Sequence, residues 1–176
     1  MNAEPTIPLN TRVHAVRSAV KNLAVIRAET STEIAQAREL FLEYAQSLGF
    51  SLCFQNFDKE LAALPGDYAP PDGRLLLAEY EGRVAGCVAL HGLGDNICEM
   101  KRLYLRPEFR GKRLGRALAE CVIAEARRIG YHRMRLDTVE PLMGDAVAMY
   151  RKMGFKEIPP YRPNPMAGAI YMELEL

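Results

Sequence analysis

One stretch organises the rest of the chain: Glu99-Met-Lys-Arg-Leu-Tyr-Leu-Arg-Pro-Glu-Phe-Arg-Gly-Lys-Arg-Leu-Gly115. It is typical of a strand that ends at Arg106-Pro107, a basic turn, and a helix whose apolar positions run from Leu114 to Ile129. The first N–H groups of a helix have no acceptor within the helix, and the helix dipole adds partial positive charge there. Gly111 and Gly115 would let a ligand approach the backbone closely. The junction is therefore predicted to hold a phosphate or pyrophosphate.

The turn also carries a local excess of positive charge. Residues 100–135 contain eleven of the 23 Lys and Arg residues and three acidic ones, whereas the whole chain has a net charge of +1. A charge run alone is typical of a solvated helix start, and it is also compatible with a nucleic-acid patch. The nearby aromatic residues Tyr104, Phe109 and Tyr131 form no stacking series, and no Walker-type G-x-x-x-x-G-K-[ST] loop is present. A small anionic ligand is favoured, and no nucleic-acid partner is expected.

Outward from this junction, strands and helices interleave. Strands are predicted at Leu23–Ala28, Leu75–Tyr80, Val84–Leu90, Ile97–Leu105, His132–Val139, Phe155–Ile158 and Ala169–Leu176. Helices are predicted from Thr30 to Gly49, at Phe57–Leu64, at Leu114–Ile129 and at Ala146–Met153. The order is strand, two helices, three strands, helix, strand, helix and two strands, which is a mixed α/β class.

Length and composition indicate one globular domain. The 176 residues are 49% hydrophobic and 26% charged. Residues 1–22 are expected to form a loose extension before a domain at 23–176. No apolar run reaches the roughly 18 residues that a membrane span needs, and no secretory h-region is present, so a cytoplasmic protein with no membrane partner is expected. The four cysteines show no zinc spacing, and the three histidines are isolated, so no metal is expected.

Three segments, in order and at matching spacing, resemble the GCN5-related N-acetyltransferase (GNAT) superfamily. The first is the strand Glu99–Pro107. The second is Arg110–Gly115, which aligns with the acetyl-CoA signature Q/R-x-x-G-x-G/A except that Arg113 replaces its first glycine. The third is Ala148-Met-Tyr-Arg-Lys-Met-Gly-Phe155, similar to the family's A-x-x-L-Y-x-x-x-G-F segment. The resemblance runs from about Leu23 to Leu176 and implies a predominantly antiparallel central sheet of about seven strands flanked by helices.

The resemblance also implies a cofactor and its site. Acetyl-CoA (coenzyme A) would pair its pantetheine arm with Leu103, Tyr104 and Leu105. Its pyrophosphate would lie on the junction, whose residues are Arg110, Gly111, Lys112, Arg113, Leu114, Gly115 and Arg116. Met143 stands where many relatives have an asparagine that faces the cofactor, so one polar contact is expected to be missing.

Acetyl transfer to an amine requires a base, because an alkylammonium group has a pKa near roughly 10. In similar enzymes the base stands on the fourth strand, which implies Glu99, acting directly or through water. The tyrosine before the G-F pair donates a proton to the departing sulfur, which implies Tyr150. The structural alternatives are an ordinary strand glutamate and a packed aromatic ring.

The acceptor is less well specified. Residues 29–81 contain ten acidic and three basic residues, which favours a cationic amine. Phe50, Phe54, Tyr161 and Arg162 lie in predicted loops that could line the pocket, and Arg162 could instead pair with a substrate carboxylate, as suits an amino-acid-like acceptor.

The sequence thus predicts an acetyl-CoA-dependent N-acetyltransferase that acts on a primary amine of a small molecule by direct attack in a ternary complex. The alternatives are a protein or peptide N-acetyltransferase and a non-catalytic acyl-CoA-binding module. Assembly into a homodimer stays open.

Overall fold

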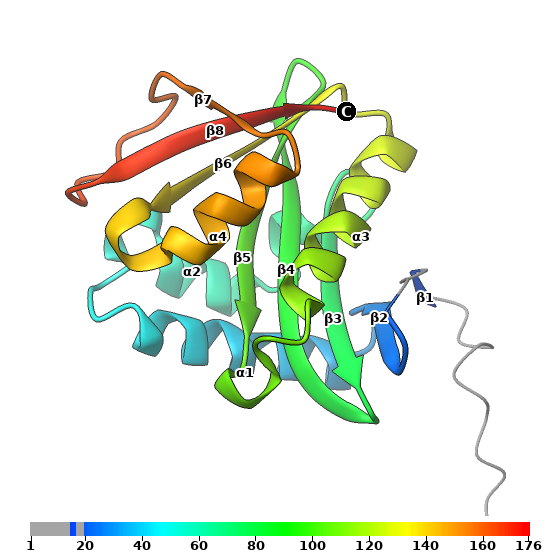
Figure 1. Ribbon diagram of the computed structural model, residues 1–176. Helices are drawn as coiled ribbons and strands as arrows, with labels where there is room; N and C mark the ends of the chain where they lie inside the picture. Colours follow the sequence, from blue (N-terminus) through cyan, green and yellow to red (C-terminus); the bar gives the residue numbers. More distant parts are fainter. Residues whose placement is uncertain (1–14, 17–19) are drawn as a thin grey trace, which may run out of the picture.

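A computed structural model describes residues 15–16 and 20–176, which form one twisted sheet with helices on both faces (Figure 1). The strands are β1 (Ala15–Val16), β2 (Leu23–Arg27), β3 (Arg74–Tyr80), β4 (Arg83–Gly94), β5 (Ile97–Leu105), β6 (Arg133–Val139), β7 (Lys156–Ile158) and β8 (Ala169–Glu175). Their order across the sheet is β1-β2-β3-β4-β5-β6-β8-β7. Every neighbouring pair is antiparallel except β5 and β6. The predicted fold class is confirmed, with the two-residue β1 added at one edge.

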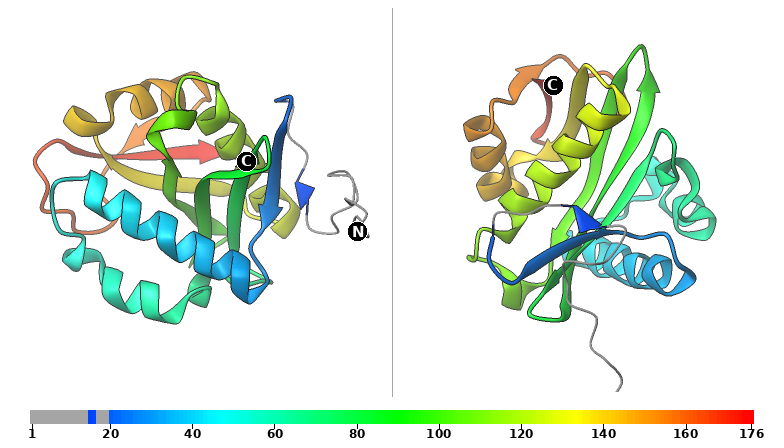
Figure 2. Two further views of the ribbon diagram at one scale, coloured as in Figure 1. Left: turned by 90° about the horizontal axis from the view of Figure 1, so that it is seen from below. Right: turned by 90° about the vertical axis from the view of Figure 1, so that its right-hand side faces the viewer.

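The helices divide between the two faces. The helices α1 (Ser31–Ser47) and α2 (Phe57–Ala63) cover one face, and α3 (Leu114–Ile129) and α4 (Glu140–Lys152) cover the other (Figure 2). Short 3-10 turns occur at Cys53–Gln55, Gly66–Tyr68 and Pro107–Phe109. Each face has its own buried cluster, because every strand of a two-sided sheet points alternate side chains to opposite layers.

Local sequence explains where the helices begin. Thr30 caps α1, since its hydroxyl accepts from the Glu33 N–H and the Glu33 carboxylate accepts from the Thr30 N–H at 2.9 Å. Along α3, the apolar side chains at Leu114, Leu118 and Val122 are buried against the sheet. This spacing is the helical period that the sequence displays.

Two predicted boundaries are corrected by the structure. Helix α4 begins at Glu140, not Ala146, and carries a kink at Met143 (φ −122°). Its first turn has no regular apolar spacing, although Pro141 is a helix-start residue. Strand β4 continues to Gly94, so its hairpin turn to β5 is Asp95-Asn96, both with positive φ. Such φ values are those of the tight turns that match strand twist.

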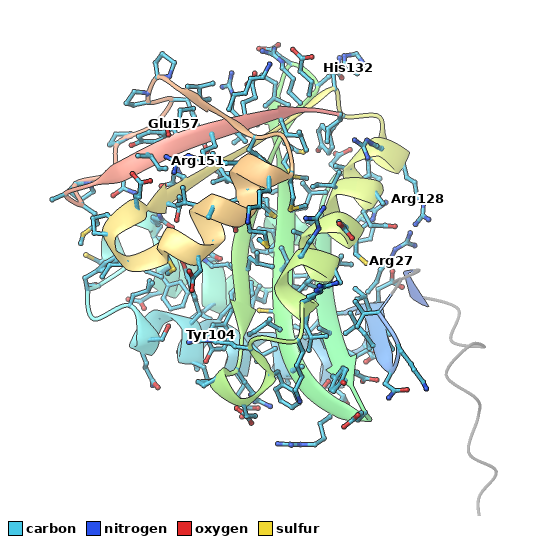
Figure 3. The ribbon with its side chains drawn as sticks, viewed as in Figure 1. Arg27, Tyr104, Arg128, His132, Arg151 and Glu157 are labelled. Atoms are coloured by element: carbon cyan, nitrogen blue, oxygen red, sulfur yellow. The ribbon has the colours of Figure 1, made fainter. Side chains whose placement is uncertain are left out.

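Ion pairs fasten the outer elements to the sheet. Buried Glu125 on α3 forms ion pairs with Arg27 of β2, Arg74 of β3 and Arg128 of α3 itself. These pairs join α3 to both strands. At the other edge of the sheet, Arg151 of α4 pairs with Glu157 of the edge strand β7 at 2.6 Å (Figure 3). Within the described residues, no helix is long and apolar enough to cross a membrane.

Candidate active site

The site lies where two central strands part. Parallel β5 and β6 pair only over Ile97–Glu99 and Arg133–Arg135. Beyond this point they separate, which leaves a cleft between the last residues of both strands, bounded by α1 on one face and α4 on the other.

A β-bulge shapes the wall of this cleft. Opposite the single residue Val88 of β4, strand β5 places two residues, Arg102 and Leu103, and Arg102 has φ +57°. On the neighbouring strand, a Cβ at Gly86 would lie 2.1 Å from the carbonyl oxygen of Tyr104, so the close approach requires glycine there. The bulge turns Leu103 toward the cleft, where it lines both cavities described below.

A groove of about 1140 Å³ runs from the end of β5 to the start of α3. Gly111 (φ +78°) and Arg113 (φ +63°) both adopt left-handed backbone, and Arg113 is the N-cap of α3 without a side-chain cap. The amides that begin α3 are therefore not capped by that side chain, and they lie beside the arginines of the turn. Such an arrangement of uncapped amides and cations is suited to an anion.

Nine of the ten residues predicted to contact the cofactor line this groove. They are Leu103, Tyr104, Leu105, Arg110, Gly111, Arg113, Leu114, Gly115 and Arg116. The exception is Lys112, whose ammonium lies 4.9 Å from the ring centre of Tyr80. Arg110 is braced against the strand, because its Nε donates to the carbonyl of Leu105. Met143, noted in the sequence as a departure from the family pattern, also lines the groove.

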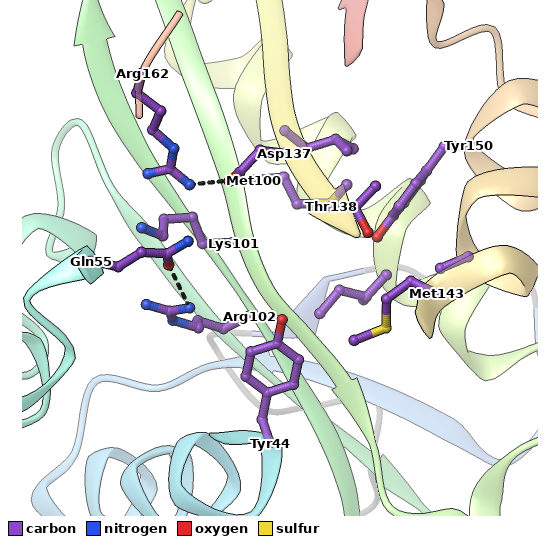
Figure 4. Close-up of a pocket in the computed structure, with 13 residues that line it drawn as sticks. Tyr44, Gln55, Met100, Lys101, Arg102, Asp137, Thr138, Met143, Tyr150 and Arg162 are labelled. Carbon is purple, nitrogen blue, oxygen red and sulfur yellow. Dashed lines mark hydrogen bonds and ion pairs between the residues drawn. The ribbon is translucent and has the colours of Figure 1, made fainter. Parts of the chain in front are cut away.

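The groove continues into a second, smaller cavity. Tyr44, Leu103, Met143 and Ala146 line both. The smaller cavity, here called the acceptor cavity, is further lined by Gln55, Met100, Lys101, Arg102, Leu136, Asp137, Thr138, Tyr150 and Arg162 (Figure 4).

Tyr150 reaches the acceptor cavity from α4. Its ring is buried against Phe155 at a centroid distance of 5.5 Å, and its hydroxyl end points toward Thr138 in Figure 4. Burial, and then the neighbouring Tyr44, raise the pKa of Tyr150 above its ordinary value. The hydroxyl therefore carries its proton at neutral pH.

Glu99 is fully buried and lines neither the groove nor the acceptor cavity. Its Oε2 lies 2.8 Å from His91 Nε2, and its Oε1 accepts from the Tyr161 hydroxyl at 2.6 Å. Arg162 donates to Glu99 as well. Burial would raise the pKa of Glu99, but the hydrogen bond from His91 and the charges of Arg162 and Lys101 lower it to about 2. Glu99 is thus an ionised carboxylate with donors on both oxygens.

The proline-rich loop 159–168 is tied down at the open end of the cleft. Arg162 pairs with Asp137 of β6 as well as with Glu99, and the Asn164 amide donates to Asp137 Oδ2 at 2.9 Å. Of the residues predicted for the acceptor, Arg162 lines the acceptor cavity, whereas Tyr161 is directed to Glu99. Phe50 lines an adjoining small cavity, and the side chain of Phe54 lies outside the described residues.

Sequence reasoning missed the residues that α1, α2 and the preceding turn bring to the cleft. Arg102 makes a two-bond pair with Glu60 of α2, at 2.9 and 2.6 Å, and its third nitrogen donates to the Gln55 side-chain oxygen. Tyr44 of α1 packs edge-on against Tyr104 at 6.0 Å. His91, which the sequence presents as isolated, contacts Glu99 because β4 and β5 pair these two positions directly.

A protein-family model described as the acetyltransferase (GNAT) family matches residues 34–155, which is well over half of the chain. The chain belongs to the acetyltransferase (GNAT) family. The predicted family and the predicted N-acetyltransferase class are thereby confirmed.

Relatives of this acetyltransferase agree with that assignment. An uncharacterised N-acetyltransferase of Schizosaccharomyces pombe is 41% identical over 157 residues, which cover 88% of this chain and 96% of the relative. An acetyltransferase structure from Streptococcus agalactiae superposes with a TM-score of 0.73 at 22% identity, covering 89% and 99% of the two chains. A GNAT structure from Elizabethkingia anophelis, described as having acetyl-CoA bound, superposes at 0.64 with 20% identity and the same coverage.

Proposed function

We propose that this acetyltransferase moves the acetyl group of acetyl-CoA to a primary amine of a small molecule, by direct attack in a ternary complex. The observation that carries the proposal is the continuity of the two cavities, which share Tyr44, Leu103, Met143 and Ala146. A donor in the groove and an acceptor in the cavity would meet at that shared wall. Holding two reactants in line is worth about 7–11 kcal/mol of barrier.

The groove residues fit the cofactor. Uncapped amides at the start of α3, with Arg110 and Arg113 beside them, suit a pyrophosphate. The Leu103–Leu105 segment presents a strand edge where β5 leaves β6, and this edge would pair with an amide-bearing arm as another strand does. When bound, acetyl-CoA supplies an activated thioester.

Two proton transfers are assigned to this chain. Tyr150 is the proposed proton donor to the leaving sulfur, since its hydroxyl is protonated and faces the cavity. Glu99 stays the predicted acceptor of the amine's proton, and its buried oxygens mean that it would act through His91 and water. An ionised carboxylate only accepts hydrogen bonds, so His91 Nε2 carries the hydrogen in their contact, which leaves Nδ1 to take a proton.

The loop that crosses the open end of the cleft favours a small acceptor over a peptide. Loop 159–168 is fastened to both Glu99 and Asp137, where an extended chain would need an open groove. The name of the Schizosaccharomyces pombe relative supports N-acetylation without specifying an acceptor.

The test is a screen of small amines and short peptides for release of the coenzyme A thiol, with wild type and Arg110→Ala compared across acetyl-CoA concentrations. We expect turnover with one or more small amines, and a raised KM for acetyl-CoA in Arg110→Ala. Release only with peptides would replace the small-molecule assignment. Tight cofactor binding with no release from any acceptor would indicate a non-catalytic binding module.

A further inference from the structure

Lys101 is the unsatisfied cation of the acceptor cavity. It lies on β5 beside Arg102, and in Figure 4 its side chain extends between those of Arg162 and Arg102. Among the described residues, no carboxylate lies within ion-pair distance of its ammonium, and it makes no side-chain hydrogen bond. Lys101 also lines an adjoining cavity under α2.

The other two cations of the cavity are already occupied. Arg102 is engaged by both oxygens of Glu60. Arg162 bridges Glu99 and Asp137, so the alternative in which Arg162 itself holds a substrate carboxylate would require it to leave two partners. Each of the three carboxylates around the cavity in turn has donors on both of its oxygens. The carboxylates therefore act on Lys101 through their charge alone, without an ion-pair contact.

Gln55 adds a neutral donor beside Lys101. An arginine carries only donors, so the bond from Arg102 at 2.9 Å identifies the Gln55 atom that faces it as the oxygen. The NH₂ group is thereby turned away from Arg102, and it makes no hydrogen bond to a described residue. Gln55 lines the acceptor cavity as well. One charged donor and one neutral donor that line the same cavity match the two oxygens of a carboxylate.

We propose that the acceptor is a carboxylate-bearing amine of the amino-acid class, and that Lys101, assisted by the Gln55 amide, binds its carboxylate. This inference rests on the proposed function and narrows its substrate. Burial and the charges of Arg102 and Arg162, opposed by the charges of Glu99 and Glu60, lower the pKa of Lys101 to about 8, so the ammonium form prevails at neutral pH. The carboxylate would anchor the acceptor while its amino group points to the wall shared with the groove.

The experiment compares L-amino acids with the amines that lack only the carboxylate, such as L-serine with ethanolamine and L-alanine with ethylamine. O-Phosphoethanolamine tests whether a phosphate serves equally. We expect a lower KM for the amino acid of the preferred pair in the wild type. We expect Lys101→Met to raise that KM about tenfold or more, and to raise it far more than the KM of the decarboxylated amine. Lys101→Arg should keep part of the preference. The control Lys156→Met removes an exposed lysine from β7 and should behave as wild type.

The two proposals fail in different ways. Calorimetric binding of the same pairs to the enzyme saturated with coenzyme A requires no turnover. Amino-acid binding that Lys101→Met abolishes would support the carboxylate site even if no acetyl transfer occurred. If decarboxylated amines bind as well as amino acids, or if Lys101→Met weakens both members of a pair equally, the inference is overturned while the acetyltransferase proposal stands. Preference for the phosphate over every carboxylate would also overturn it.

Discussion

The surroundings of Tyr150 support its proposed role as proton donor. Its hydroxyl reaches the acceptor cavity while its ring packs on Phe155, so one residue both completes the core and lines the cavity. The Tyr150→Phe variant keeps the packing and removes the proton. We expect a loss of kcat by about 10²-fold or more, with the coenzyme A Kd within about twofold of wild type. Steady-state kinetics measure kcat, and calorimetry measures the coenzyme A Kd. An unchanged kcat would show that Tyr150 has a packing role only.

Glu99 is a buried anion that neighbouring donors keep ionised. Because its folded pKa of about 2 lies below the ordinary value of 4.5, the ionised form stabilises the fold above about pH 4.5. That contribution disappears as the pH falls from about 4.5 toward 2. The Glu99→Gln variant should therefore be less stable than wild type by about 1–3 kcal/mol at pH 7, with the difference shrinking in acid. Denaturant melts at pH 7, 4.5 and 3 measure it, and a difference independent of pH would contradict the assignment.

The activity of Glu99→Gln separates two roles for the same carboxylate. If the Glu99–His91 pair takes the proton, the pH profile of kcat/KM should change shape and lose its acidic limb, because that limb reports protonation of the base. If Glu99 only fastens loop 159–168, the rate should fall by the same factor at every pH. His91→Gln, which removes the titratable ring, should reproduce the first outcome and not the second.

At the scale of elements, the start of α3 adopts a glycine-like conformation without glycine. Arg113 has φ +63° where the family pattern has glycine, so the loop keeps its contour and adds a charge at the cost of backbone strain. Arg113→Gly should raise the unfolding free energy by up to about 1 kcal/mol, whereas Arg113→Ala keeps the strain. Both variants should weaken coenzyme A binding by a similar factor if the charge contacts the cofactor. Thermal melts measure the change in stability, and calorimetry measures the affinity for coenzyme A. Equal affinity in wild type, Arg113→Gly and Arg113→Ala would show that the Arg113 charge does not contact the cofactor.

The Arg102–Glu60 pair joins α2 to the bulge of β5. Removing one partner leaves the other charge buried, so Arg102→Met is expected to cost about 3–5 kcal/mol of stability. The double variant Arg102→Met/Glu60→Gln should recover part of that loss. A double-mutant cycle from denaturant melts measures the coupling, and strictly additive losses would show that the two side chains act independently.

At the scale of the whole molecule, the groove joins the ends of β5, α3 and α4, so a ligand there connects elements from both halves of the sheet. Coenzyme A at 100 times its Kd should stabilise the enzyme by about 2.7 kcal/mol. For a domain of this size, that amounts to a rise in Tm of about 5–10 °C. Arg110→Ala should need more ligand for the same rise, and Lys156→Met should match wild type. No shift at any ligand concentration would count against the groove as the cofactor site.

The order of strands and helices, the family and the turn that lines the groove could all be predicted from the sequence. These features depend on short-range patterns: apolar spacing, turn residues and the contiguous run from Arg110 to Gly115. The predicted start of α4 was wrong because the first turn of this helix has no regular apolar spacing. The burial of Glu99 could not be predicted because the partners of a strand residue lie on other segments of the chain. Loop 159–168 supplies two of those partners, 62 and 63 residues away in the chain.

What the sequence alone determined is therefore the turn and the helix start that line the groove, because an anion site built on helix amides needs only a turn, a helix start and adjacent charges. Tertiary structure decided which residues line the acceptor cavity. Tyr44, Gln55, Lys101 and Arg162 come from four separate segments, and only the parting of β5 from β6, with the bulge at Arg102, brings them to one cavity. Arg102 and Arg162 form ion pairs with carboxylates, whereas Lys101 does not. Which cation can bind a ligand therefore depends on contacts that exist only in the folded chain.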